Sequence, residues 1–209
     1  MELNHPEATA QALSILRSGD PFQWYVITLL ALVVYVYFTE IANRNWRGIA
    51  AGLSLYMVHW FVEIINAIIQ HTTGHALWTA PTGTAFLILI GVGVEISLMF
   101  SIAGIVFSKI LPEDQHMKIM GLNNRFVFAL GNAAFFSIFE IFLVKTPAFV
   151  WVYPWWGAYT VFATVYIPFF LVSMYCYDWK PKTQVAVIGS LFAVNAALLV
   201  IFGVLLKWI

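Results

Sequence analysis

The sequence predicts an all-α integral membrane protein, a polytopic helical bundle of about six transmembrane helices. Three observations predict this fold class: 62% of the 209 residues are hydrophobic, only 10% are charged, and the mean hydropathy is +0.86. Soluble domains contain roughly 45–50% apolar residues, and a membrane span needs about 20 mostly apolar residues. We therefore expect one transmembrane domain over residues 1–209, with a polar or interfacial segment over residues 1–23.

Apolar stretches long enough to cross a bilayer follow one another along the chain, and each break between them contains charged residues, Asn, Gly or Pro. Before the first stretch, residues 8–17 are expected to form a short interfacial helix. Pro168 predicts a kink in the fifth stretch, because proline removes one backbone hydrogen bond. The expected spans are residues 24–42, 48–70, 82–110, 124–145, 149–176 and 184–207.

The distribution of basic residues predicts the orientation of the bundle. Arg17, Lys145 and Lys207 lie on one side, and the other seven Lys and Arg residues follow the first, third and fifth spans. Because cytoplasmic loops carry an excess of Lys and Arg, both termini are expected to be non-cytoplasmic. An aromatic belt is expected at the same edge, formed by Trp24, Tyr25, Trp78, Trp151, Tyr153, Trp155, Trp156 and Trp208.

Glutamates inside the expected spans are the strongest indication of a functional site. Glu63, Glu95 and Glu140 each have apolar sequence on both sides. A charged side chain at the bilayer centre costs about 2.5–3.5 kcal/mol on insertion scales, so such groups normally face a bundle interior or a cavity. The span directions place these glutamates at similar depth, together with His59 and Asn195. We therefore expect them to share one polar cavity.

His59 and Glu63 are spaced i and i+4 on one helix face, and Asn66 continues that face. An imidazole and a carboxyl group at this spacing can hold one proton between them, as acid–base chemistry requires. Alternatively, both side chains only bond neighbouring helices and lock the bundle. Glu140 could reach water or Lys145 near the interface, so both a structural and a functional role stay open for it.

Carboxylates and histidines also bind metals, but the sequence does not favour a metal site. Di-iron bundles use Glu-x-x-His pairs on two helices, whereas Asn occupies the corresponding position after Glu40 and after Glu63. His71 and His75 lie in an outer loop and would add ligands only if that loop folded inward. We expect no metal and no cofactor, because the sequence contains no Cys-x-x-Cys, haem-attachment or phosphate-loop motif. A formal net charge of zero argues against a nucleic-acid partner.

Several residues follow one another in a recognisable order, which is His59-x-x-x-Glu63, Glu95, Gly131 followed by Phe135-Phe136 and Glu140, then Pro168 and Asp178. This order resembles the EXPERA family, which includes the emopamil-binding sterol isomerases. The resemblance implies that His59, Glu63 and Glu95 handle protons in an alkene isomerisation. The helix with Trp60 and Glu63 is also similar, more faintly, to one in small integral-membrane terpene cyclases.

Both resemblances imply carbocation chemistry, and the residues permit it. A buried glutamic acid can protonate an alkene, and aromatic faces stabilise a cation by about 0.5–2 kcal/mol each. The substrate is expected to enter sideways from the bilayer. The candidate catalytic residues are His59, Glu63, Glu95 and Glu140, and the candidate substrate-binding residues are Trp60, Asn66, Phe136, Trp156, Tyr159 and Asn195.

The favoured interpretation is a membrane-embedded isomerase or cyclase that acts on a lipophilic isoprenoid or sterol-like substrate. The expected partners are thus a lipophilic small molecule and the lipid bilayer. Intramembrane Glu and His residues are also typical of proton relays, so a proton-coupled transporter is an alternative. A structural or accessory subunit of a membrane complex is another.

Overall fold

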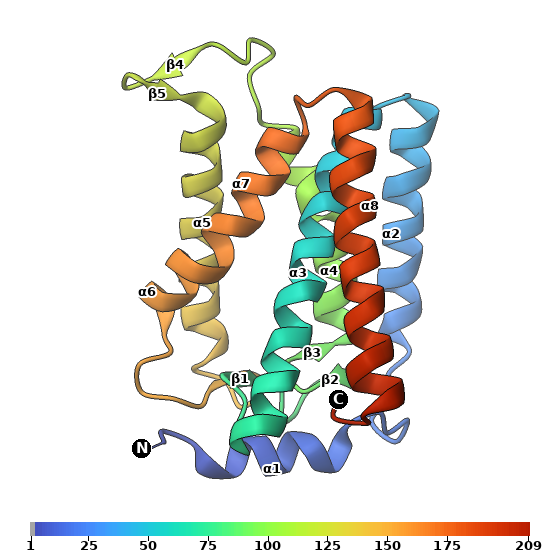
Figure 1. Ribbon diagram of the computed structural model, residues 1–209, viewed down its shortest axis with the longest axis vertical. Coiled ribbons are helices and arrows are strands. Elements are labelled where there is room, and N and C mark those ends of the chain that lie inside the picture. The colour runs from blue at the N-terminus through green and yellow to red at the C-terminus, as the bar shows by residue number, and fades with distance from the viewer. Residues whose placement is uncertain (1–2) are drawn as a thin grey trace.

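The computed structural model describes residues 3–209 and shows a bundle of helices. Helix α1 lies across one end of this bundle, and the β4–β5 hairpin projects at the other (Figure 1). The helices are α1 (Pro6–Ile15), α2 (Tyr25–Ala42), α3 (Trp46–Thr73), α4 (Val94–Ser108), α5 (Asn124–Leu143), α6 (Ala158–Val161), α7 (Ile167–Cys176) and α8 (Pro181–Leu198), with π-helical segments η1 (Phe162–Tyr166) and η2 (Leu199–Leu205). Short antiparallel ladders pair β1 (Trp78–Thr79) with β6 (Val150–Trp151), β2 (Leu87–Leu89) with β3 (Val92–Gly93), and β4 (Lys118–Ile119) with β5 (Leu122–Asn123).

The predicted fold class, a polytopic helical membrane protein, is confirmed. Within residues 3–209, five helical stretches are long and apolar enough to cross a membrane. They correspond to five of the six expected spans, and α4 is a shorter apolar helix in the region of the remaining one. The five stretches are Tyr25–Ala42, Trp46–Thr73, Asn124–Leu143, Ala158–Cys176 and Pro181–Leu205.

The third expected span, residues 82–110, is wrong over its first part, where the chain forms the buried β2–β3 hairpin. Two glycines allow the hairpin to pack closely. A Cβ added to Gly91 would lie 2.4 Å from Trp78 Nε1, and one added to Gly93 would lie 2.1 Å from Thr84 Oγ1. Helix α4 has only 15 residues and is therefore roughly 22 Å long. That length is less than the hydrocarbon thickness of about 30 Å.

Helix α3 is the central element of the bundle and packs against α2, α4, α7 and α8. Asn45 caps its start by accepting a hydrogen bond from the Gly48 N–H, and Gly74, with φ +82°, ends it. Helix α5 packs instead against α7, α6 and η1. The aromatic core between these groups includes Phe136 of α5 and Phe169 of α7.

Small residues let α3 and α4 cross at close distance. A Cβ on Gly104 would lie 2.5 Å from the Ala51 carbonyl oxygen and 2.8 Å from Gly52 Cα. Likewise, a Cβ on Gly52 would lie 2.5 Å from Ile105 Cγ1. Membrane helices gain van der Waals contact through such small-residue crossings. The crossing therefore holds the short α4 against the central helix.

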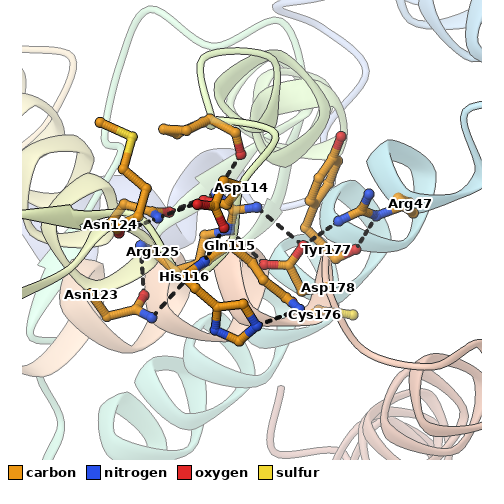
Figure 2. A network of polar contacts seen from close by, with 12 residues as sticks. Arg47, Asp114, Gln115, His116, Asn123, Asn124, Arg125, Cys176, Tyr177 and Asp178 are labelled. Carbon is orange, nitrogen blue, oxygen red and sulfur yellow. Dashed lines mark hydrogen bonds and ion pairs between the residues drawn. The ribbon is translucent and has the colours of Figure 1, made fainter.

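An ion-pair network joins three helices at the β4–β5 end of the bundle (Figure 2). Asp178, just after α7, accepts hydrogen bonds from Arg47 of α3 and from Arg125 of α5, the latter with Nε to Oδ2 at 2.5 Å. Arg125 also donates to the Pro112 carbonyl at 2.8 Å, and its side chain is only 1% exposed. The Arg47 guanidinium lies 4.3 Å from the centroid of the Tyr177 ring. Asp178 therefore connects the end of α7 to the first turns of α3 and α5.

We expect Gly104→Val to lower the free energy of unfolding by about 1–3 kcal/mol, the usual cost of overpacking. The added methyl groups would meet the backbone of α3. Gly131→Val in α5 is the matched control, because nothing lies within 4 Å of a Cβ built there. Melting temperatures in detergent check this prediction. Equal melting temperatures for the two variants would contradict the close crossing.

Candidate functional site

A cavity of about 60 Å³ lies between α3, α4, α5 and the α6–η1–α7 segment. A water needs roughly 10–15 Å³ of such space, so the cavity can hold a few waters or a small part of a ligand. Most of its lining is aliphatic or aromatic. The lining residues with polar side-chain atoms are His59, Glu63, Trp78, Glu140, Trp156 and Tyr166.

Glu63 reaches the cavity from α3, and only one of its carboxyl oxygens has a partner. Oε1 accepts a hydrogen bond from the Trp78 indole N–H at 3.3 Å. Oε2 is buried and has no hydrogen-bond partner within residues 3–209. Leaving a buried polar atom unpaired costs about 1–3 kcal/mol. A ligand that bonds to Oε2 would recover this cost.

His59 lies one helical turn before Glu63 in the same cavity lining. Its ring stacks on Phe100 with centroids 4.3 Å apart. In the part of the chain that the structure describes, His59 Nε2 and Trp156 Nε1 also lack partners. Because Nε2 and Glu63 Oε2 are both unpaired, a proton shared by the two side chains has to pass through a ligand or water. Three unpaired polar atoms thus belong to one cavity lining.

Glu140, on α5, differs from Glu63 because both of its carboxyl oxygens accept hydrogen bonds. Oε1 accepts from Trp151 Nε1 at 2.6 Å, and Oε2 accepts from the Tyr166 hydroxyl. The side chain is buried. Hydrogen bonds from β6 and from η1 therefore fix Glu140 in the cavity wall.

The β1–β6 ladder supplies an indole donor to each of the two carboxyl groups. Trp78 of β1 lies opposite Trp151 of β6 in this ladder. Trp78 donates to Glu63, and Trp151 donates to Glu140. The ladder joins the chain that follows α3 to the chain that follows α5. It therefore fixes the helices that carry the two glutamates relative to each other.

The π-helical segment η1 positions Tyr166 in the cavity wall. Pro168 has no amide hydrogen, so the helix before it cannot keep its regular hydrogen bonding. Phe162–Tyr166 form the π-helix, and α7 begins at Ile167. The helix is therefore irregular just before Pro168, where a kink was expected. Such π-helical turns are frequent at functional sites.

Glu95 does not line the cavity, so the prediction that it shares one site with Glu63 is wrong. Its carboxylate accepts hydrogen bonds from the Tyr25 hydroxyl, from Thr84 Oγ1 at 2.7 Å and from the Ala85 N–H at 2.5 Å. The physical reason is the late start of α4, which places Glu95 in its first turn. A carboxylate is favoured there by the helix dipole. Glu95 joins α2 to the chain before β2.

The structure places only some of the expected substrate-binding residues in the cavity. Phe136 and Trp156 line the cavity. The Asn66 side chain instead donates to the Trp78 carbonyl at 2.9 Å and holds the chain after α3 in place. Tyr159 is 82% exposed, since it points out of the bundle from α6. Asn66 and Tyr159 are therefore not cavity residues.

Trp60 and Asn195 line a different, apolar groove between α3 and α8. There, Asn195 Nδ2 donates to the Met57 carbonyl at 2.8 Å and joins the two helices. The two outer histidines are also away from the cavity. His71 stacks on the Trp208 ring with centroids 4.7 Å apart. Within residues 3–209, no group of three or more His, Cys, Asp or Glu side chains is placed to hold a metal ion.

Two side chains in the cavity lining are also exposed on the outer surface of the bundle. Met99 of α4 is 39% exposed and Phe139 of α5 is 48% exposed. In a membrane these side chains contact the hydrocarbon layer. Met is unbranched and adapts its shape easily. Met99 and Phe139 therefore each lie between the cavity and the outer surface of the bundle.

Sequence reasoning assigns Trp78 and Trp151 to an aromatic belt and gives Tyr166 no role. The structure shows that all three donate hydrogen bonds to the cavity carboxyl groups. A buried Trp or Tyr usually finds a polar partner. An intramembrane carboxyl group is such a partner, and this is the signal by which these residues could have been found.

Comparison with known proteins places the chain in a family. A family model described as "uncharacterized membrane protein family" matches residues 6–204. An uncharacterized protein of Archaeoglobus fulgidus is 45% identical over 208 residues, which cover 97% of this chain and 99% of the relative. No solved structure matches the chain.

These comparisons correct the resemblance to the EXPERA family and the fainter likeness to terpene cyclases. The family model that matches nearly the whole chain is a different one, so both resemblances are wrong. They rested on the order and spacing of residues. The structure separates those residues, because Glu95 bonds to α2 and Asp178 bonds to Arg47 and Arg125.

Trp151→Phe keeps an aromatic ring but removes the N–H that Glu140 accepts. We expect the free energy of unfolding to fall by about 1–3 kcal/mol, because a buried carboxyl oxygen loses its partner. The control is Trp155→Phe, since the Trp155 side chain is 51% exposed. Thermal unfolding in detergent compares the two. If both variants melt like the unmodified protein, Glu140 does not depend on the ladder.

Proposed function

The chain belongs to the uncharacterized membrane protein family, and from its cavity we propose that it is a membrane-embedded acid–base enzyme. It is an isomerase or cyclase that acts on a lipophilic isoprenoid or sterol-like alkene. One observation carries this proposal: Glu63 Oε2, His59 Nε2 and Trp156 Nε1 belong to the lining of one aromatic cavity, and none has a hydrogen-bond partner within residues 3–209.

Glu63 is the proton donor in this proposal. Its Oε2 gives a proton to one alkene carbon, a C–H bond forms, and positive charge develops on the other carbon. The hydrogen bond from Trp78 to Oε1 holds the carboxyl group in place during this step. A positioned acid or base contributes roughly 10²–10⁴-fold to the rate.

The aromatic lining stabilises the resulting carbocation. The rings of Phe100, Phe136, Trp78 and Trp156 all line the cavity. Each aromatic face can contribute about 0.5–2 kcal/mol of cation–π attraction, the larger value in desolvated sites. Because the lining is mostly apolar, few waters can reach the cation and capture it as an alcohol.

His59 is the base that ends the reaction. Its Nε2 removes a proton from a carbon next to the cation, which leaves a shifted or newly formed double bond. His59 lies one turn from Glu63, so after the product leaves the proton can return through a water to the carboxylate for the next cycle. Glu140 is a positioning residue, because both of its oxygens are already bonded to the wall.

The substrate enters from the bilayer between Met99 and Phe139. These two side chains line the cavity and are exposed on the outer surface. A cavity of about 60 Å³ holds only the reacting end of a long substrate. The rest of the molecule stays between α4 and α5 or in the lipid. This volume favours the end of a linear isoprenoid chain over a fused ring system.

Hydrogen exchange tests the proposed chemistry without knowledge of the natural substrate. The purified protein is incubated in D₂O with a panel of isoprenoid alkenes, and deuterium in recovered alkenes is measured by mass spectrometry. We expect incorporation with at least one alkene. It should fall about a hundredfold or more in Glu63→Gln and in His59→Ala, consistent with the usual size of acid–base effects. Glu113→Gln, at an exposed loop position, is the control.

Melting temperatures of the same preparations separate a chemical role from a structural one. Loss of exchange in a folded Glu63→Gln protein supports Glu63 as the donor. Full exchange in that variant would exclude Glu63. Absence of exchange with every alkene, together with proton-linked uptake of a solute into liposomes, would favour a proton-coupled transporter instead.

We also propose that both termini face away from the cytoplasm. Helix α1 and the C-terminal residues lie at the same end of the bundle (Figure 1). Of the ten Lys and Arg residues, Arg17, Lys145 and Lys207 are expected at this end, and cytoplasmic loops normally carry the excess. Fusions of a reporter that is active only in the cytoplasm should be inactive at either terminus. Activity at either one would overturn the orientation.

A further inference from the structure

A second pocket, of about 220 Å³, opens at the α1 end of the bundle. It is formed by the end of α1, by α3, by the β2–β3 turn and by the residues after η2, which fold back toward α1. In Figure 1 the C-terminus lies beside β2 and close to α1. One part of the pocket lining is polar, with Arg17, Lys207 and Gln70, and another part is apolar, with Leu13, Leu16 and Ile90.

Neither basic residue of this pocket has an acidic partner among residues 3–209. No ion pair within residues 3–209 includes Arg17 or Lys207. Arg17 Nε donates to the Ile88 carbonyl at 3.3 Å, which anchors the guanidinium beside β2. Within the described residues its terminal nitrogens form no ion pair, so they can contact an anion. A guanidinium and an ammonium group together suit a phosphate group, since arginine binds it through paired N–H groups and lysine acts as a point charge.

The backbone brings both side chains to the pocket through an unfavourable conformation. Arg17 and Lys207 each have φ of 57°, a region that non-glycine residues rarely adopt. The Arg17 N–H donates to the Leu87 carbonyl at 2.9 Å. The chain reversal at Lys207 lets the Trp208 N–H donate to the Phe202 carbonyl at 2.7 Å. Such strained residues cluster at ligand clamps.

The pocket also has the features of a membrane interface. Trp208 lines it and stacks on His71, and tryptophan is enriched where the hydrocarbon layer meets the headgroups. The apolar side chains of Leu13 and Ile90 lie in the same lining as the two cations. A ligand that matches both parts is negatively charged at one end and apolar at the other.

We propose that this pocket binds the phosphate-bearing headgroup of an anionic membrane lipid. Arg17 and Lys207 contact the phosphate, and the start of a lipid chain lies along the apolar part of the lining. The bound lipid connects α1 to the residues after η2, so it stabilises this end of the bundle. The proposal is independent of the chemistry in the central cavity, because none of the residues in this lining also lines that cavity.

Thermal shifts in a neutral detergent test the proposal. The purified protein is titrated with dioleoyl-phosphatidylglycerol, with dioleoyl-phosphatidylcholine and with inorganic phosphate. We expect a saturable rise in melting temperature with phosphatidylglycerol and little change with the other two. In the double variant Arg17→Gln/Lys207→Gln the apparent affinity for phosphatidylglycerol should fall by about tenfold or more, because two charge-assisted contacts are lost.

Two further double variants test whether lipid binding depends on the charges of this pocket. Lys180→Gln/Lys182→Gln removes two exposed charges at the other end of the bundle and should leave lipid binding unchanged. Arg17→Lys/Lys207→Arg keeps both charges and should keep most of the binding. An equal response to both lipids, an unchanged response in Arg17→Gln/Lys207→Gln, or an equal shift with inorganic phosphate alone would overturn the assignment to an anionic lipid.

Discussion

Two buried carboxyl groups at membrane depth determine much of the arrangement around them. Lipid cannot hydrogen-bond Glu63 or Glu140, and an unsatisfied polar group in hydrocarbon costs several kcal/mol. The protein therefore supplies its own donors, Trp78 for Glu63 and Trp151 with Tyr166 for Glu140. The β1–β6 ladder and the π-helix before Pro168 place these donors. The bundle is thus organised to hold two carboxyl groups in one aromatic cavity.

The difference between the two glutamates is the reason for proposing Glu63, and not Glu140, as the reacting group. Glu140 has both oxygens bonded, so it has no free acceptor for a ligand. Among the residues that the structure describes, Glu63 Oε2 and His59 Nε2, one helical turn apart, have no hydrogen-bond partner. The imidazole stacks on Phe100, which fixes its ring plane. The proposed function therefore assigns the reaction to these two side chains.

Hydropathy is sufficient to predict the helical membrane fold and five of its spans, but it does not reveal the β2–β3 hairpin over residues 87–93. A short buried strand and a segment of a buried helix are both continuous apolar runs. Hydrophobic periodicity therefore cannot distinguish them. The glycines at 91 and 93 were the available signal. This error also misplaced Glu95, whose depth was inferred from a continuous helix. The donors Trp78 and Tyr166 depend on contacts between distant segments, which spacing along one helix cannot show.

A density map of the protein in a lipid environment tests the central claim most directly. The proposed function predicts an elongated ligand that passes between Met99 and Phe139 and ends within hydrogen-bonding or van der Waals distance of Glu63 Oε2 and His59 Nε2. It also predicts that Glu140 stays bonded to Trp151 and Tyr166. Side chains that close the cavity completely, or a file of waters that connects it to both sides of the membrane, would contradict the claim.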